Sequence, residues 1–173
     1  MANTKEQTIK IALVGAGMFG GDVHTRAYAD LQRSGIAGQL ARVGLDLWTR
    51  DFSGIEFELV AVGTRSEGSA QKAADRYLDL TGKRPQPFFG DTPWVDILKA
   101  FPDLDILAVA PPDHLHTQPI LDALNAGVHV LTEKPMCLSI HEADEIISLA
   151  NQKGLVVGVD MHKRYDPDHL RIR

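Results

Sequence analysis

The sequence predicts an α/β fold in which helices cover both faces of a doubly wound parallel sheet. Short apolar runs rich in β-branched residues alternate with amphipathic stretches along the 173 residues, and a glycine-rich loop follows the first run. Continuous apolar runs are typical of strands that are buried on both faces. Because alternating strands and helices form right-handed parallel crossovers, a ligand is expected at the carboxyl ends of the strands.

The composition is that of an ordinary globular protein, with 44% hydrophobic and 24% charged residues. The length suits one domain with a full core. The net charge of −5 argues against nucleic-acid binding and against docking on anionic membranes. The polar residues 1–7 contain no apolar signal core, so we expect a cytoplasmic protein. We also expect no metal site, and the single cysteine, Cys137, excludes an intramolecular disulfide.

The apolar runs are the expected strands, and residues with cap preferences mark the helices between them. The runs are residues 9–14, 57–62, 106–110, 129–131 and 155–159. Thr92 can cap a helix that has Pro93 at its first position. Ser139 and Glu142 form a capping box, and Gly127 and Gly154 stand where helices should end. Residues 1–160 therefore form one predicted domain.

Residues 31–55 are longer than the first crossover of a minimal unit requires. The spacing of Ile36, Leu40, Val43 and Leu47 predicts an extra amphipathic helix. Two interpretations stay open. The segment is either an insertion at the surface or at an interface, or a two-part first crossover with no functional role.

The strongest motif follows the first expected strand, and it reads Gly15-Ala16-Gly17-Met18-Phe19-Gly20. Three glycines between a strand and a helix are the fingerprint of a dinucleotide-binding domain of the Rossmann type. Gly15 permits the tight turn, Gly17 lets the pyrophosphate approach the backbone, and Gly20 lets the helix pack on the strand. The helix start then offers N–H groups to phosphates. The alternative is a glycine-rich turn that binds nothing.

The end of the second strand should indicate which dinucleotide binds. NAD-binding domains usually carry an acid there, about 20 residues past the glycines, whereas this strand ends in Thr64-Arg65-Ser66. Arg65 and the two hydroxyls can instead hold a 2′-phosphate. We therefore favour NADP over NAD. An ordinary helix start capped by Ser66 is the alternative.

Two further segments lie at the same expected edge of the sheet. Ala110, Pro111 and Pro112 stop a strand and shape a loop, and His116 follows as either a cofactor-proximal or a helix-start histidine. Glu133 and Lys134 follow another strand, where a lysine can bond a substrate hydroxyl and bias its proton transfer. A solvated turn with a Glu–Lys pair is the alternative for this second segment.

Taken together, these segments resemble the glucose–fructose oxidoreductase / inositol dehydrogenase / MocA family. The resemblance covers nearly the whole chain in the expected order. The matching segments are the glycine loop, Pro112 with His116, residues 123–130, Glu133-Lys134-Pro135 and Arg164-Tyr165-Asp166-Pro167. The run from residue 110 to residue 135 is the most specific part, because many other families share the glycine loop.

The resemblance implies an oxidoreductase that transfers hydride between a nicotinamide and a sugar or polyol. It assigns the catalytic role to Lys134, with Glu133 shaping the motif, and it makes His116 cofactor-proximal. It also implies that residues 161–173 begin a crossover to a substrate domain that this chain lacks, so we expect cofactor binding with little turnover. A homo-oligomer is possible. The alternative function is a non-catalytic dinucleotide-binding module.

Overall fold

The computed structural model describes residues 7–42, 44, 45, 52 and 54–164, without the side chains of Met18 and Phe19. Its sheet has six parallel strands in the order β3-β2-β1-β4-β5-β6, which confirms the doubly wound topology. The strands are β1 (Gln7–Val14), β2 (Ile55–Thr64), β3 (Gln86–Phe89), β4 (Ile106–Val109), β5 (His129–Glu133) and β6 (Val157–Asp160).

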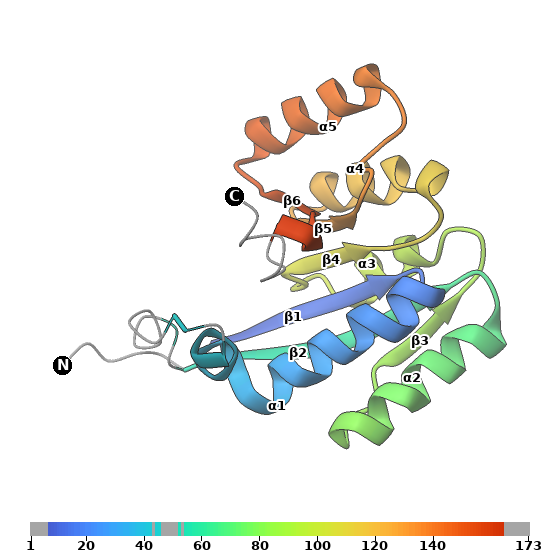
Figure 1. The fold of residues 1–173 in the computed structure, drawn as a ribbon. Coiled ribbons are helices and arrows are strands. Elements are labelled where there is room, and N and C mark those ends of the chain that lie inside the picture. Colours follow the sequence, from blue (N-terminus) through green and yellow to red (C-terminus); the bar gives the residue numbers. More distant parts are fainter. Residues whose placement is uncertain (1–6, 43, 46–51, 53, 165–173) are drawn as a thin grey trace.

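Helices cover both faces of this sheet (Figure 1). The helices are η1 (Met18–His24), α1 (Thr25–Arg42), α2 (Glu67–Thr81), α3 (Pro93–Ala100), η3 (Asp113–Leu115), α4 (Thr117–Asn125), α5 (Ile140–Lys153) and η4 (His162–Arg164). The side chains of β1 alternate between two cores. Ile11 and Leu13 pack with α1 and α2, whereas Ala12 and Val14 pack with α3, α4 and α5. This alternation explains the continuous apolar run, because both faces of the strand are buried.

Most of the expected helix boundaries are confirmed. The Ser139 hydroxyl accepts the Glu142 N–H at 3.2 Å, and Glu142 in turn accepts the Leu138 N–H at 3.2 Å. Gly127 and Gly154 have φ values of 83° and 66°, the left-handed backbone that favours glycine after a helix. Thr92 precedes α3, but its side chain makes no capping hydrogen bond.

Strand β3 has no counterpart among the predicted runs. It contains Pro87, which has no N–H to donate to a sheet and so argues against a strand. In the structure β3 is the last strand on its side of the sheet and pairs with β2 alone. Proline is tolerated there because an edge strand can leave one side unpaired.

The extra helix expected within residues 31–55 is continuous with the first crossover. Helix α1 runs on to Arg42 and bends at Gly35, whose φ of 64° and ψ of 173° are not helical. Ile36 and Leu40 follow the bend and are half-buried, whereas Val43 and Leu47 lie outside the described residues. Among the residues that the structure describes, no helix is long and apolar enough to cross a membrane.

Candidate functional site

A cleft of about 750 Å³ opens at the carboxyl ends of the strands. It lies beside β1 and β4, the neighbouring strands at which the strand order reverses, where doubly wound sheets bind their ligands. Eight residues predicted for the cofactor site line it. The predicted residues in the lining are Gly15, Ala16, Gly17, Thr64, Arg65, Ala110, Pro111 and Pro112.

The three glycines of the loop have different surroundings. Gly15 has a φ of 89°, and a Cβ atom there would lie 2.4 Å from the Ala110 carbonyl carbon. At Gly20 a Cβ atom would lie 1.8 Å from the Gly15 carbonyl oxygen. At Gly17 it would meet no atom within 4 Å. Gly15 and Gly20 are therefore needed for close packing, whereas Gly17 leaves open room beside the cleft.

The helix after the loop differs from the expected one. Gly17 precedes η1, a π-helix of seven residues, and only then does α1 begin. Its wider turn is closed by the Thr25 N–H, which donates to the Gly20 carbonyl, and the Thr25 hydroxyl donates to the same oxygen at 2.9 Å. π-Turns of this kind are rare and often occur at functional sites.

The end of β2 shows the helix cap that its sequence predicted, and the role of Arg65 stays a prediction. The Ser66 hydroxyl caps α2 by accepting the Ser69 N–H at 3.4 Å, and Ser66 does not line the cleft. The Thr64 hydroxyl is buried and donates to the Ser66 carbonyl at 2.8 Å. Arg65 lines the cleft with 91% of its side chain exposed, and its Nε lies 3.7 Å from Asp91. Of these side chains, Arg65 is the one that extends into solvent at the cleft.

The histidine after the proline loop lies beneath the surface. His116 is fully buried at the start of α4, so its ring does not line the cleft as a cofactor-proximal residue would. Its Nδ1 lies 2.7 Å from the Pro135 carbonyl oxygen, and its Nε2 lies 2.8 Å from that of Pro111. The neighbouring His114 and Leu115 line the cleft instead. His116 therefore joins the two loops.

The Glu133-Lys134 segment is not a turn with a Glu–Lys side-chain pair. Glu133 ends β5 and is buried, and Lys134 is exposed directly after it. One Glu133 oxygen accepts the Lys134 backbone N–H at 3.2 Å, while the other meets His24. Neither Glu133 nor Lys134 lines the cleft. Lys134 thus extends from a turn whose backbone a buried carboxylate holds.

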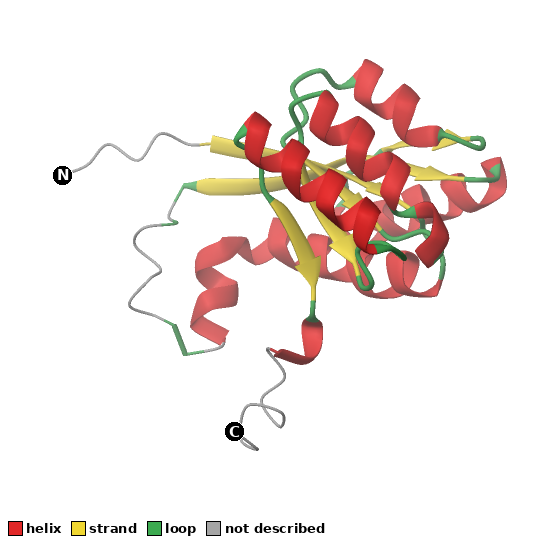
Figure 2. Cartoon of the chain, turned by 90° about the horizontal axis from the view of Figure 1, so that it is seen from above, coloured by secondary structure: helices red, strands yellow, loops and turns green. Residues whose placement is uncertain are grey.

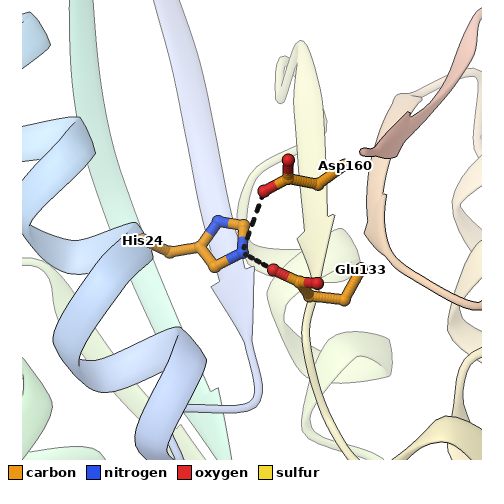
Figure 3. A group of neighbouring side chains, drawn as sticks. All are labelled: His24, Glu133 and Asp160. Carbon is orange, nitrogen blue, oxygen red and sulfur yellow. Dashed lines mark hydrogen bonds and ion pairs between the residues drawn. The ribbon is translucent and has the colours of Figure 1, made fainter. Parts of the chain in front are cut away.

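Three residues that the sequence did not single out gather around this carboxylate. His24 Nε2 lies 2.8 Å from Glu133 Oε1 and 4.0 Å from Asp160 Oδ2 (Figure 3). The hydroxyl of Tyr28 contacts the other ring nitrogen. The expectation of no metal site overlooked this group, whose potential ligand atoms all lie within 4.8 Å of one another. The sequence signal is limited to two acids, Glu133 and Asp160, close to the ends of expected strands, because their pairing in register is visible only in the structure.

Comparison with known proteins finds sugar and inositol dehydrogenases among the proteins that this chain is similar to. D-glucoside 3-dehydrogenase of Escherichia coli is 28% identical over 165 residues, which cover 95% of this chain and 38% of that protein. The scyllo-inositol 2-dehydrogenase (NADP(+)) IolW of Bacillus subtilis is 32% identical over 72 residues, 42% of this chain and 20% of that protein.

A solved structure has a similar fold. Levoglucosan dehydrogenase in complex with NADH and levoglucosan matches with a TM-score of 0.68 at 22% identity, and the match covers 91% of this chain and 36% of that one. This chain therefore spans well under half the length of these proteins.

The family described as "Oxidoreductase family, NAD-binding Rossmann fold" matches residues 9–161. The match begins in β1 and ends just after β6, so it includes nearly all of the sheet and the residues that line the cleft. The chain therefore belongs to this glucose–fructose oxidoreductase / inositol dehydrogenase / MocA family of oxidoreductases, and its sheet is the family's NAD-binding Rossmann fold.

Proposed function

We propose that the cleft binds NADP(H) or NAD(H) with the pyrophosphate over Gly17. The open space beside Gly17 carries the proposal, because a Cβ atom there would meet no atom within 4 Å. The cleft volume of about 750 Å³ also lies within the usual range of ligand pockets, about 300–1,000 Å³. No side chain caps the start of η1, so backbone N–H groups of the loop can donate to phosphate oxygens.

The adenosine end favours NADP(H) in this proposal. Relatives use either cofactor, since one is named for NADP(+) and another was solved with NADH. Arg65 supplies a positive charge at the end of β2, and its pair with Asp91 is fully exposed to solvent. Exposed ion pairs contribute little, about 0–1 kcal/mol. A 2′-phosphate can therefore replace Asp91 as the partner of Arg65.

Two substitutions test this cofactor choice. Arg65→Ala should weaken the binding of NADPH by roughly ten- to a hundredfold, the contribution of a charge-assisted hydrogen bond. The affinity for NADH should stay nearly unchanged. Asp91→Ala is the matched control, because it removes the carboxylate that competes with the 2′-phosphate for Arg65 and should strengthen the binding of NADPH. Dissociation constants follow from nicotinamide fluorescence. Tighter binding of NADH than of NADPH by the unaltered chain contradicts the NADP assignment, while binding of neither cofactor contradicts the proposed function.

The proposed reaction is hydride transfer between the cofactor and a carbinol or ketone carbon of a sugar or cyclitol. The chemistry that the cofactor supplies is hydride transfer at C4 of the nicotinamide. Lys134 is exposed at the carboxyl end of β5, and we assign it the role of donating a hydrogen bond to the reacting oxygen. Its ammonium group then stabilises the negative charge that develops on this oxygen and assists its proton transfer.

The sugar or cyclitol substrate is inferred from the relatives, whose names include a glucoside, an inositol and levoglucosan. The test is a screen of such compounds with both cofactors, following the absorbance of the reduced nicotinamide. Any turnover that the chain shows should fall by about 10²–10⁴-fold in Lys134→Ala, the usual contribution of a proton-transfer group. Lys99→Ala, on the exposed end of α3, is the control. Unchanged turnover in Lys134→Ala would refute the assigned role.

A further inference from the structure

The turn that carries Lys134 is held by a chain of buried side chains from other elements. His24 comes from η1, Glu133 from the end of β5, and Asp160 from the end of β6, and all three point toward one another (Figure 3). The side chains of His24 and Glu133 are only 5% and 8% exposed. The 2.8 Å contact between them joins residues 109 positions apart in the sequence.

The hydrogen bonds in this cluster can be assigned from the chemistry of Glu133 and Tyr28. The Tyr28 hydroxyl lies 3.1 Å from His24 Nδ1. Burial raises the pKa of the Tyr28 phenol far above its ordinary value, and the carboxylates of Asp160 and Glu133 raise it further. The Glu133 carboxylate can only accept a hydrogen bond, so its 2.8 Å contact places a ring proton on His24 Nε2. In the neutral ring Nδ1 is then the acceptor, and the protonated Tyr28 phenol donates to it.

This assignment gives both hydrogen bonds of the His24 ring a donor and an acceptor. Among the described residues, no buried side-chain nitrogen or oxygen lacks a hydrogen-bond partner. The three residues have the chemistry of metal ligands, but the hydrogen bonds of His24 and Glu133 are formed without an ion. The geometry therefore favours a positioning role over a metal site.

The positioning acts on the backbone of Lys134. Glu133 uses one oxygen to accept from His24 and the other to accept the Lys134 N–H at 3.2 Å. On the far side of Lys134, the Pro135 carbonyl contacts His116. The turn is thus held on both sides, while the Lys134 side chain between them remains exposed.

We propose that His24 is a positioning residue for Lys134, acting through Glu133. His24 keeps the Glu133 carboxylate in its buried place, and that carboxylate fixes the direction in which the Lys134 side chain leaves the sheet. Without His24, a buried carboxylate would lose its main partner and would turn toward water, since burying an unpaired charge is costly. The Lys134 N–H would then lose its acceptor. This role rests on the proposed function, in which Lys134 meets the reacting oxygen.

The first test measures the His24 ring in the unaltered chain. In ¹⁵N NMR spectra, Nε2 should carry the proton and Nδ1 should have the signature of an acceptor. Tyr28→Phe removes the phenol donor and should change the Nδ1 signal. A ring that carries its proton on Nδ1 alone would overturn the proposal, and this result needs no substitution of His24.

The second test measures amide hydrogen exchange at Lys134 in substituted chains. His24→Leu should speed exchange at this amide by about tenfold, or ~1.4 kcal/mol, with the amides of β1 and β4 unchanged. His24→Gln, whose amide N–H can replace Nε2–H, should restore slow exchange. His24→Asn is too short to reach Glu133 and should resemble His24→Leu. A purely structural role would instead speed exchange throughout the sheet and give no difference between the glutamine and asparagine variants.

The outcomes separate this inference from the proposed function. NADPH and NADH titrations of the unaltered chain test the cofactor site alone. If the chain binds cofactor while exchange at Lys134 is unaffected in His24→Leu and His24→Asn, the positioning role is wrong and the cofactor site stands. If the exchange results are as expected but no cofactor binds, His24 still orders the turn, and the proposed function is wrong.

Discussion

Gly15 and Gly20 are needed for packing, whereas Gly17 is expected to be needed for cofactor binding alone. Gly17→Val tests this difference. Gly17 has a φ of −71° and a ψ of −153°, which any residue can adopt. It is exposed, and an added Cβ atom meets nothing within 4 Å. We therefore expect the free energy of unfolding to change by no more than about 0.5 kcal/mol, as at most surface positions.

Binding should respond very differently to the same substitution. The valine methyl groups would fill the space through which the pyrophosphate approaches the loop backbone. A hydrogen bond to a charged group contributes about 1.5–3 kcal/mol, so losing one weakens affinity by roughly 10- to 150-fold. Both NADPH and NADH should be affected, because both contain the pyrophosphate.

Gly20→Ala is the matched control, because it changes packing under the same loop. Its Cβ atom would lie 1.8 Å from the Gly15 carbonyl oxygen. The neighbour is backbone, so the loop and η1 must move apart. Overpacking of this kind costs about 1–3 kcal/mol, which lowers Tm by roughly 2–12 °C in a domain of this size.

The assay combines nicotinamide fluorescence titrations with thermal unfolding of each variant without cofactor. Gly17→Val should melt like the unaltered chain and bind poorly, whereas Gly20→Ala should melt earlier. If folded Gly17→Val binds either cofactor with unchanged affinity, the pyrophosphate does not lie over this loop. If Gly20→Ala is as stable as the unaltered chain, the loop and η1 can accommodate a Cβ atom at this position, and glycine is not required there for packing.

Three further substitutions test the framework of the site. Ser139→Ala should lower the free energy of unfolding in urea by about 1 kcal/mol through loss of the α5 cap. Hydrogen bonds from Ser139 and then Thr117 lower the pKa of the Glu142 carboxyl in the folded protein. The stability that they contribute is present above the pKa of the unfolded chain and is lost as the pH falls through the folded pKa. Because Ser139→Ala removes the larger of these effects, its stability should fall less in acid than that of the unaltered chain. Burial raises the pKa of Tyr77 from 10.0 to about 12. The contribution of the protonated Tyr77 phenol to folding stability is therefore complete below pH 10 and is lost as the pH rises through about 12. Urea denaturation at pH values on either side of 10 should show that Tyr77→Phe loses less stability at alkaline pH than the unaltered chain. His116→Phe removes the ring N–H that joins the two loops, so the free energy of unfolding in urea should fall by about 0.5–1.5 kcal/mol, the net contribution of a hydrogen bond; equal stability in urea would contradict this role.

Local sequence patterns were enough to predict the fold and the glycine loop. The strand before Gly15 and the capping box at Ser139 depend on neighbours within a few residues, so their patterns are visible in the chain itself. The roles assigned to Gly17, Arg65 and Lys134 remain predictions. The strand that contains Pro87 was missed, because only its place at the sheet edge makes that proline acceptable.

The tertiary structure alone decided which distant side chains meet. His24, Glu133 and Asp160 belong to three separate elements, and no local pattern indicates that they share one buried cluster. Burial likewise decided that His116 joins two loops instead of lining the cleft. The physical reason is that helix caps and strand runs are determined by short-range sterics and hydrogen bonding, whereas a buried polar side chain finds its partners only when crossovers bring the strand ends together.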